Sequence, residues 1–360
     1  MYVLLVVAIV VFGVFVWLKQ PQYVAPGRDA GGESALYRDG QFSNPVSPAP
    51  ANSGGSRGVI AIWYRFLFFK PKDAIPQQAL PSLKVDLHAL PGTDNVIIWM
   101  GHSSYFCQVD GYRFLVDPVF SEDASPVPGT NRAFKGSNVY HAIDIPEIDY
   151  LLITHDHWDH LDYPTVSQLR DKIRHVVTPT GVGSYFKKWG FPDSAITQGE
   201  WFSTVEQSDL TLHILPSQHF SGRLFKRNPT LWGSFAIITP HHRLYFGGDS
   251  GYGPHFQEIY QRVGEFDISV LECGQYDDDW PRIHMTPEQT AQAASDLHST
   301  AVLPSHNSKF KLAHHAWYEP LERISAASKH HSWQLKTPRI GERINIDDPQ
   351  QAFTAWWRSQ

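Results

Sequence analysis

The first apolar stretch of the chain runs from Tyr2 to Leu18 and contains no charged residue. Its length is at the short end of what crosses a bilayer as a helix, and Trp17 and Lys19 lie where interfacial anchors are common. No basic segment precedes it and no small-residue cleavage site follows at once, so a cleaved secretory signal is the weaker alternative. We expect residues 1–19 to form a membrane-anchoring helix. The few positive groups beside it favour a cytoplasmic domain without deciding the side.

The next segment, residues 20–57, is rich in Pro, Gly, Ser and Asn and has few large apolar residues. This composition is typical of a flexible tether. An aromatic-rich piece follows from Ile60 to Phe69. We interpret it as a packed aromatic layer, with a patch that contacts membrane or substrate as the alternative. We expect a folded domain over 58–345 and a C-terminal tail over 346–360.

Short apolar runs separated by turn residues fill the folded part of the chain. Asp110-Gly111 lies between two such runs and is a strong hairpin signal, so 95–100, 104–109 and 112–116 are predicted to be antiparallel strands. Further strands are predicted at 150–153, 175–177, 210–215, 234–239, 243–246, 268–271 and 301–303, and helices at 165–173, 183–189, 256–263 and 287–297. Two strand-rich halves with interspersed helices indicate an α/β fold in which two sheets pack together under outer helices.

The strand predicted at 150–153 leads directly into His155, His157, Asp159 and His160. Imidazole nitrogen and carboxylate oxygen are ligands that divalent cations such as Zn²⁺ accept. The two histidines at 155 and 157 point the same way in an extended segment, and a turn after them can aim Asp159 and His160 at a second point nearby. A solvated histidine-rich loop is the alternative, but the strand-then-ligand context favours two adjacent metal ions.

Other potential ligands recur where predicted strands end. His219, Asp249 and His306 each follow an apolar run, and ligands on the same edge of packed sheets converge in space. His284 precedes the start of the helix at 287, and the pattern alone leaves open whether it is a site residue or a polar helix-end residue. The paired histidines are expected at the surface, at 241–242, 314–315 and 330–331.

Composition narrows the classes of partner. The net charge is −6, with 42% hydrophobic and 13% aromatic residues, which is enough for a sizeable core. No block of Lys and Arg supplies the positive field that a nucleic acid requires, so we expect no nucleic-acid partner. Cys107 and Cys273 are far apart in sequence and provide no disulfide framework. The oligomeric state is not predicted.

The ordered set of His155, His157, Asp159, His160, His219, Asp249 and His306 resembles the metallo-β-lactamase superfamily. Further segments resemble its branch of N-acyl-phosphatidylethanolamine-hydrolysing phospholipase D and bacterial relatives, at 99–103, 114–120, 125–126, 246–252 and 273–276. The resemblance implies an αββα sandwich, here preceded by the N-terminal membrane helix, with two metal ions, usually zinc. It implies a first metal held by His155, His157 and His219, a second held by Asp159, His160 and His306, a bridging Asp249, and contact of His284 with a substrate phosphate. The chain departs from the family pattern after the last ligand, where Asn307-Ser308-Lys309-Phe310 replaces Trp-Gly-Thr-Phe.

These features predict a two-metal hydrolase that uses a metal-bridging hydroxide, with Asp159 and His284 as its catalytic residues. Two nearby cations lower the pKa of a bridging water and stabilise phosphoryl or carbonyl oxygens, while Asp159 orients the attacking group. The resemblance favours a phosphodiesterase of the phospholipase D type acting on a lipid or amphiphile. A lactonase or amidase on the same site is the alternative. A di-iron oxygen or nitric oxide reductase is disfavoured because no flavin-binding domain is visible, and a non-catalytic metal scaffold is disfavoured because the ligand set is complete.

Overall fold

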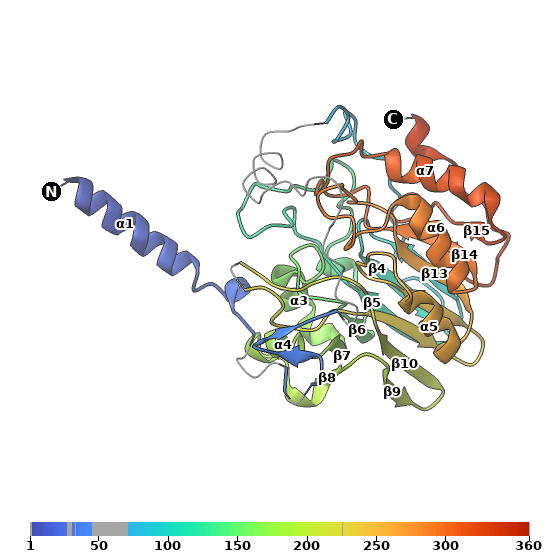
Figure 1. Ribbon diagram of the computed structural model, residues 1–360, viewed down its shortest axis with the longest axis horizontal. Helices are drawn as coiled ribbons and strands as arrows, with labels where there is room; N and C mark the ends of the chain where they lie inside the picture. The colour runs from blue at the N-terminus through green and yellow to red at the C-terminus, as the bar shows by residue number, and fades with distance from the viewer. Residues whose placement is uncertain (1, 27–30, 33, 45–70, 225, 360) are drawn as a thin grey trace.

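Two seven-stranded sheets face each other in the computed structural model, which describes residues 2–26, 31–32, 34–44, 71–224 and 226–359 (Figure 1). The first sheet has the order β16-β3-β4-β5-β6-β7-β8, with β3 at Val96–Trp99, β4 at Tyr105–Val109, β5 at Tyr112–Val116, β6 at Ile148–Leu152, β7 at Ile173–Pro179, β8 at Ile196–Gly199 and β16 at Arg343–Asn345. The second has the order β15-β14-β13-β12-β11-β10-β9, with β9 at Ser203–Gln207, β10 at Leu210–Leu215, β11 at Ser234–Ile238, β12 at Arg243–Phe246, β13 at Phe266–Glu272, β14 at Ser299–Ser305 and β15 at Gln334–Leu335.

Helices cover the outer faces of both sheets. Side chains of α3 (Tyr163–Leu169) and α4 (Gly183–Lys188) pack on the first sheet, and those of α5 (His255–Val263), α6 (Pro287–Asp296) and α7 (Glu319–Ala327) pack on the second. A separate apolar core fills the space between the sheets. Both sheets contain parallel and antiparallel pairs, so the predicted αββα sandwich of mixed sheets is confirmed.

The hairpin predicted around Asp110-Gly111 is confirmed. Asp110 and Gly111 have φ angles of 46° and 83°, which is the left-handed pair that a two-residue hairpin turn requires, and β4 pairs antiparallel with β5 across them. The helix predicted at 165–173 instead ends at Leu169. A 3₁₀ turn occupies Arg170–Lys172, and Ile173 already begins β7. Other 3₁₀ turns are η1 at Pro21–Tyr23, η2 at Ala142–Asp144, η4 at Asp193–Ala195, η5 at Ser328–His330 and η6 at Trp356–Ser359.

The N-terminal apolar stretch forms α1 (Tyr2–Trp17), which extends away from the domain (Figure 1). A helix of 16 residues is about 24 Å long at 1.5 Å per residue, whereas the hydrocarbon layer is about 30 Å thick. In the described part of the chain, no helix reaches the length and hydropathy needed to cross a membrane. The predicted transmembrane helix is therefore not supported.

Part of the predicted tether packs on the domain. β1 (Tyr37–Arg38) and β2 (Gln41–Phe42) form a hairpin, and the buried Phe42 contacts the core around Leu231 and Trp232. Asn44 Nδ2 donates to the carbonyl of His219 at 2.9 Å. The rest of the tether from residue 45, and the aromatic piece from Ile60 to Phe69, lie outside the described residues.

The C-terminal segment also belongs to the folded domain. Ile346, Trp356 and Trp357 are buried in the core between the sheets, and the Trp356 indole N–H donates to the carbonyl of Pro338 at 3.1 Å.

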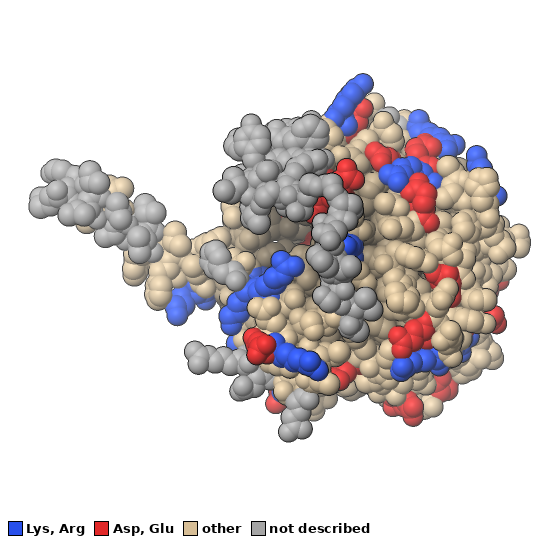
Figure 2. Space-filling model, viewed as in Figure 1, with Lys and Arg blue, Asp and Glu red and all other residues tan. Residues whose placement is uncertain are grey.

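On the face of the molecule shown in Figure 2, Lys and Arg side chains are interspersed with Asp and Glu.

Candidate metal centre

Histidine and aspartate side chains that follow different strands meet at one edge of the sandwich. One group consists of His155, His157, His219 and Asp249, and a second of His102, Asp159, His160 and His306. Within each group the potential ligand atoms all lie within 4.8 Å of one another. The structure thus brings together all seven residues that the sequence predicted as ligands, and adds His102.

Asp249 lies between the two groups and faces both. Its Oδ2 atom is 3.8 Å from Nε2 of His155 and 3.7 Å from Nε2 of His219. Its Oδ1 atom is 3.1 Å from Nε2 of His160 and also contacts Nδ1 of His306. A carboxylate that directs one oxygen to each group has the geometry of a bridging ligand.

A glycine allows this loop to approach the histidine loop. Gly248 has a φ angle of +57°, which strains any residue with a Cβ. A Cβ at this position would also lie 2.8 Å from Cβ of Thr154, immediately before the histidine cluster. The backbone next to Asp249 can therefore be this close only with glycine.

Asp117, which directly follows β5, holds the histidine loop in place through two contacts. Its Oδ1 accepts from the backbone N–H of Thr154 at 2.8 Å, and its Oδ2 lies 2.7 Å from Nδ1 of His160. Because Asp117 holds Nδ1 of His160, the Nε2 atom of this ring points at Asp249. Carboxylates commonly orient metal-ligating histidines in this way. Asp156 faces elsewhere, because it accepts from the hydroxyl of Tyr185 at 2.8 Å and from the N–H of Gly222 at 2.6 Å.

Burial and neighbouring charges shift the pKa values at the centre in different directions. Burial holds the pKa values of His155 and His219 well below the usual value, so both imidazoles are neutral and can coordinate. Burial alone would also lower the pKa of His160, but the carboxylates of Asp249, Asp159 and Asp117 outweigh it and raise that pKa. Burial alone would raise the pKa of Asp249, yet His160 and His306 hold it well below the usual range.

Two buried ring nitrogens at the centre, Nε2 of His306 and Nδ1 of His102, have no hydrogen-bond partner among the described residues. Buried polar atoms are otherwise almost always paired. Divalent cations accept imidazole and carboxylate ligands of this kind, so the residues present fit bound metal ions.

His102 and Glu272 are site residues that the sequence interpretation missed. The fully buried His102 has its Nε2 atom 2.9 Å from Oδ2 of Asp159, and its φ angle is +54°. Its place in the Gly101-His102-Ser103 motif could have indicated it. Glu272 ends β13 beside the other strand ends, and the rule that found His219 and Asp249 could have been applied to it.

His284 lies next to both groups. Its ring centroid is 5.1 Å from that of His219 and 5.2 Å from that of His306, and its Nδ1 atom contacts the buried Glu272. It also forms a potential ligand group with Asp249 and His306. The helix that follows, α6, begins at Pro287 and is capped by Thr286, whose side chain accepts from the N–H of Gln289. This cap fixes the segment that carries His284.

One of the histidines expected at the surface is buried. The side chain of His314 is only 1% exposed, and its Nδ1 atom lies 2.7 Å from Oδ2 of Asp277. The carboxylate partner compensates for burying the imidazole, which the sequence pattern did not reveal.

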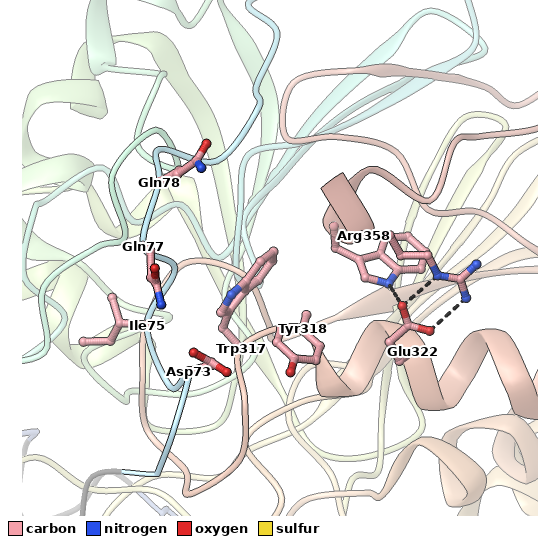
Figure 3. A pocket seen from close by; sticks show the side chains of 9 residues that line it. Asp73, Ile75, Gln77, Gln78, Trp317, Tyr318, Glu322 and Arg358 are labelled. Carbon is pink, nitrogen blue, oxygen red and sulfur yellow. Dashed lines mark hydrogen bonds and ion pairs between the residues drawn. The ribbon is translucent and has the colours of Figure 1, made fainter. Parts of the chain in front are cut away.

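A cavity of about 480 Å³ is lined by residues outside the histidine groups (Figure 3). Glu322 accepts hydrogen bonds there from Trp357 and Arg358. The lining includes Asp73, Ile75, Gln77, Gln78, Trp317, Tyr318, Glu322, Trp357 and Arg358, and none of these belongs to the histidine groups.

Known proteins share both the sequence and the fold. A beta-lactamase superfamily domain matches residues 112–307. An uncharacterised protein of Mycobacterium tuberculosis is 35% identical over 359 residues, which cover 95% of each chain. N-acyl-phosphatidylethanolamine-hydrolysing phospholipase D 1 of Caenorhabditis elegans is 26% identical over 328 residues, covering 81% of this chain and 90% of that protein.

Among solved structures, CmlA, a diiron β-hydroxylase from Streptomyces venezuelae, superposes with a TM-score of 0.54 at 20% identity, over 71% of this chain and 55% of that chain. This likeness is one of fold. Since the family match spans more than half of the sequence, the chain belongs to the metallo-β-lactamase superfamily, among the metal-dependent hydrolases related to N-acyl-phosphatidylethanolamine-hydrolysing phospholipase D.

Proposed function

We propose that this protein is a two-metal phosphodiesterase of the phospholipase D type that acts on a lipid or amphiphilic substrate. The observation that carries the proposal is the position of Asp249, whose two oxygens face different histidine groups. The relationship to the phospholipase D of Caenorhabditis elegans supports the substrate class.

In this proposal some residues hold the metal ions and others orient the attacking water. His155, His157 and His219 would hold a first divalent ion, zinc in our proposal, Asp159, His160 and His306 a second, and Asp249 would bridge them. Such a pair supplies an activated water and stabilises charge on phosphoryl oxygens. Asp159, held at Oδ2 by His102, would orient the attacking water and accept its proton.

His284 would contact the substrate phosphate. Because Nδ1 contacts Glu272, the Nε2 atom is the one left for a ligand. A cavity of about 350 Å³ adjoins this side chain and offers room for a substrate. Its lining includes Tyr276, Asp277, Asp278, Pro281, His284, Thr286, Gln289, His314, His315, Glu319 and Arg323.

The test combines metal analysis with a panel of phosphodiester, lactone and β-lactam substrates. We expect two zinc ions per chain and phosphodiester hydrolysis that chelation abolishes and zinc restores. Robust lactone hydrolysis without phosphodiester cleavage would support the lactonase alternative and overturn the phosphodiesterase. Iron with a visible absorption band and oxygen consumption would instead support chemistry like that of the di-iron neighbour.

We further propose that α1 attaches the enzyme to a membrane surface without crossing it, on the cytoplasmic side. The helix is apolar on all sides, and Leu5, Ile9, Phe12 and Phe15 are each more than half exposed. An exposed apolar surface of this kind is stabilised by leaving water. A lipid substrate would then be met at the surface where the helix lies.

A further inference from the structure

Arg223 is a buried cation without a hydrogen-bond partner. Its residue is 6% exposed, and Nε, Nη1 and Nη2 all lack a partner among the described residues. A guanidinium carries five N–H donors and stays protonated in proteins. Burying such a group unpaired is costly, so the position calls for an acceptor that the described residues do not supply.

The guanidinium lines a cavity of about 200 Å³. Its central carbon lies 3.6 Å from the ring centroid of Trp158 and 5.7 Å from that of Tyr185. Stacking on aromatic faces holds the guanidinium plane and leaves its N–H edges available for a ligand. The rest of the lining is mixed. Prolines and tyrosines form its apolar part, at Tyr23, Pro126, Pro128, Tyr163 and Pro164, and polar or acidic side chains form the remainder, at Gln22, Ser121, Glu122, Asp123, Ser125 and Asp162.

The nearby carboxylates already have other donors. Asp162 accepts from the N–H and hydroxyl of Ser121, at 3.1 and 2.9 Å, and from the hydroxyl of Thr165. Asp156 accepts from Tyr185 and Gly222, as described above.

The two acids at the rim of the cavity, Glu122 and Asp123, face Arg132 at 3.0 and 3.6 Å. These carboxylates moderate the positive potential, but none of them occupies the donors of Arg223. A ligand that fills them must therefore bring its own acceptors.

The cavity lies between the segment that follows α1 and the loop that carries the metal ligands. Trp158 stands in the sequence between His157 and Asp159, and its ring centroid is 5.6 Å from that of Tyr23. Tyr23 in turn packs on Trp17 at the end of α1, with centroids 4.4 Å apart. A molecule bound in this cavity would touch Tyr23, which packs on the end of α1, and Trp158 in the loop that carries the ligands.

We propose that this cavity is a second ligand site that binds the phosphate group of an anionic amphiphile, with Arg223 as a bidentate hydrogen-bond donor to that phosphate. Arginine matches phosphate geometry with two parallel hydrogen bonds. The proline and aromatic walls suit the apolar part next to the phosphate. This site is separate from the metal ligands, and it stands whether or not the metal centre cleaves phosphodiesters.

The test uses the full chain as isolated, with circular dichroism as a check on folding, and every variant keeps the same metal ligands. Calorimetric titration with dihexanoyl phosphatidate should show binding that depends on Arg223. Arg223→Met should weaken binding by about 10-fold or more, the range for losing hydrogen bonds to a charged group. Arg223→Lys should keep part of the affinity, because a lysine supplies charge without the paired geometry.

Arg174→Met is the matched control, because Arg174 is 62% exposed and pairs with Glu147 and Asp149 at the surface. It should bind as the parent does. Tighter binding of dihexanoyl phosphatidate than of inorganic phosphate identifies a lipid headgroup as the source, and equal binding identifies free phosphate.

Equal affinity in the parent, Arg223→Met and Arg223→Lys would overturn the site, as would no binding of either probe to the parent. If Arg223→Met does not fold, the comparison of Arg223→Lys with Arg174→Met decides.

Discussion

The carboxylate of Glu272 contacts Nδ1 of His284 and accepts a hydrogen bond from the backbone N–H of Ser250 at 2.7 Å. Glu272 is fully buried, so the contact is shielded from water. One side chain thus joins the segment of His284 to the loop that carries Asp249. The orientation of His284 and the position of the bridging carboxylate depend on the same group.

His284→Ala should lower kcat/KM for a phosphodiester by roughly 10²-fold or more, the range for losing one aimed donor. The loss should be smaller for any lactone that is accepted, because a neutral carbonyl gains less from a charge-assisted hydrogen bond than a phosphate does. Metal content should not change. A variant that lost metal in proportion to activity would show that His284 is a ligand instead.

Glu272→Gln should lower kcat/KM for a phosphodiester by about 10-fold, the lower end for residues that orient a functional histidine. Glutamine keeps the shape and an acceptor for Ser250, so the fold should persist. Steady-state kinetics with elemental analysis measures the effect. Unchanged kinetics would mean that the contact is only structural.

The double variant His155→Ala, His157→Ala should lose most of a metal content that is close to two ions per chain in the parent. Both residues follow β6 on a loop outside the core, so the soluble fold should remain. Elemental analysis and circular dichroism measure the two effects. Parental metal content in this variant would refute the assignment of the cluster.

Lys309→Met should flatten the rise of stability with pH between 7 and about 10. The buried Nζ of Lys309 donates to the carbonyl of Val119 at 2.8 Å, and burial lowers its pKa to about 7. In this window the unfolded chain binds the proton and the folded chain does not, so stability rises with pH by at most about 1.4 kcal/mol per unit from this group.

Urea unfolding at pH 7 and 9 measures that slope. Lys187→Met is the control, since Lys187 is 47% exposed and pairs with Asp193. Its slope should match that of the parent. An equal slope in Lys309→Met would mean that Lys309 stays charged in the fold.

Removing residues 1–20 should release the protein from membranes and leave turnover of a soluble substrate nearly unchanged. The truncation removes α1 and keeps Tyr23, which contacts the domain through Pro126. Sedimentation with vesicles and a soluble-substrate assay measure the two effects. Retention on membranes would point to another contact surface, such as the piece from Ile60 to Phe69.

The fold and the meeting of the ligands at one site could be predicted from the sequence, because both follow from apolar strands that are each followed by a potential ligand. His155, His219, Asp249 and His306 follow apolar strands, and strand ends at one edge of packed sheets meet in space. Elements without such a pattern were missed. β9 is a half-exposed Ser203–Gln207 segment that owes its form to pairing with β10, and β16 has only three residues.

His102 and Arg223 were not predicted as site residues, because no ligand spacing marks them. His102 has no ligand spacing to another histidine and reaches Asp159 only through a left-handed backbone turn. Arg223 shares its loop with Lys226 and Arg227, and arginines in loops are mostly exposed. Its burial results from packing against Trp158, and that contact is tertiary.

The pairing of β16 with β3 has a consequence for synthesis on the ribosome. β3 is the first strand of its sheet in the chain, whereas its outer neighbour β16 (Arg343–Asn345) is the last strand of that sheet to be translated. Until those residues emerge, the hydrogen-bonding edge of β3 has no partner strand. We therefore expect the nascent chain to complete this sheet only after residues 343–345 have emerged, and a chain stalled before residue 343 to be the form that chaperones retain.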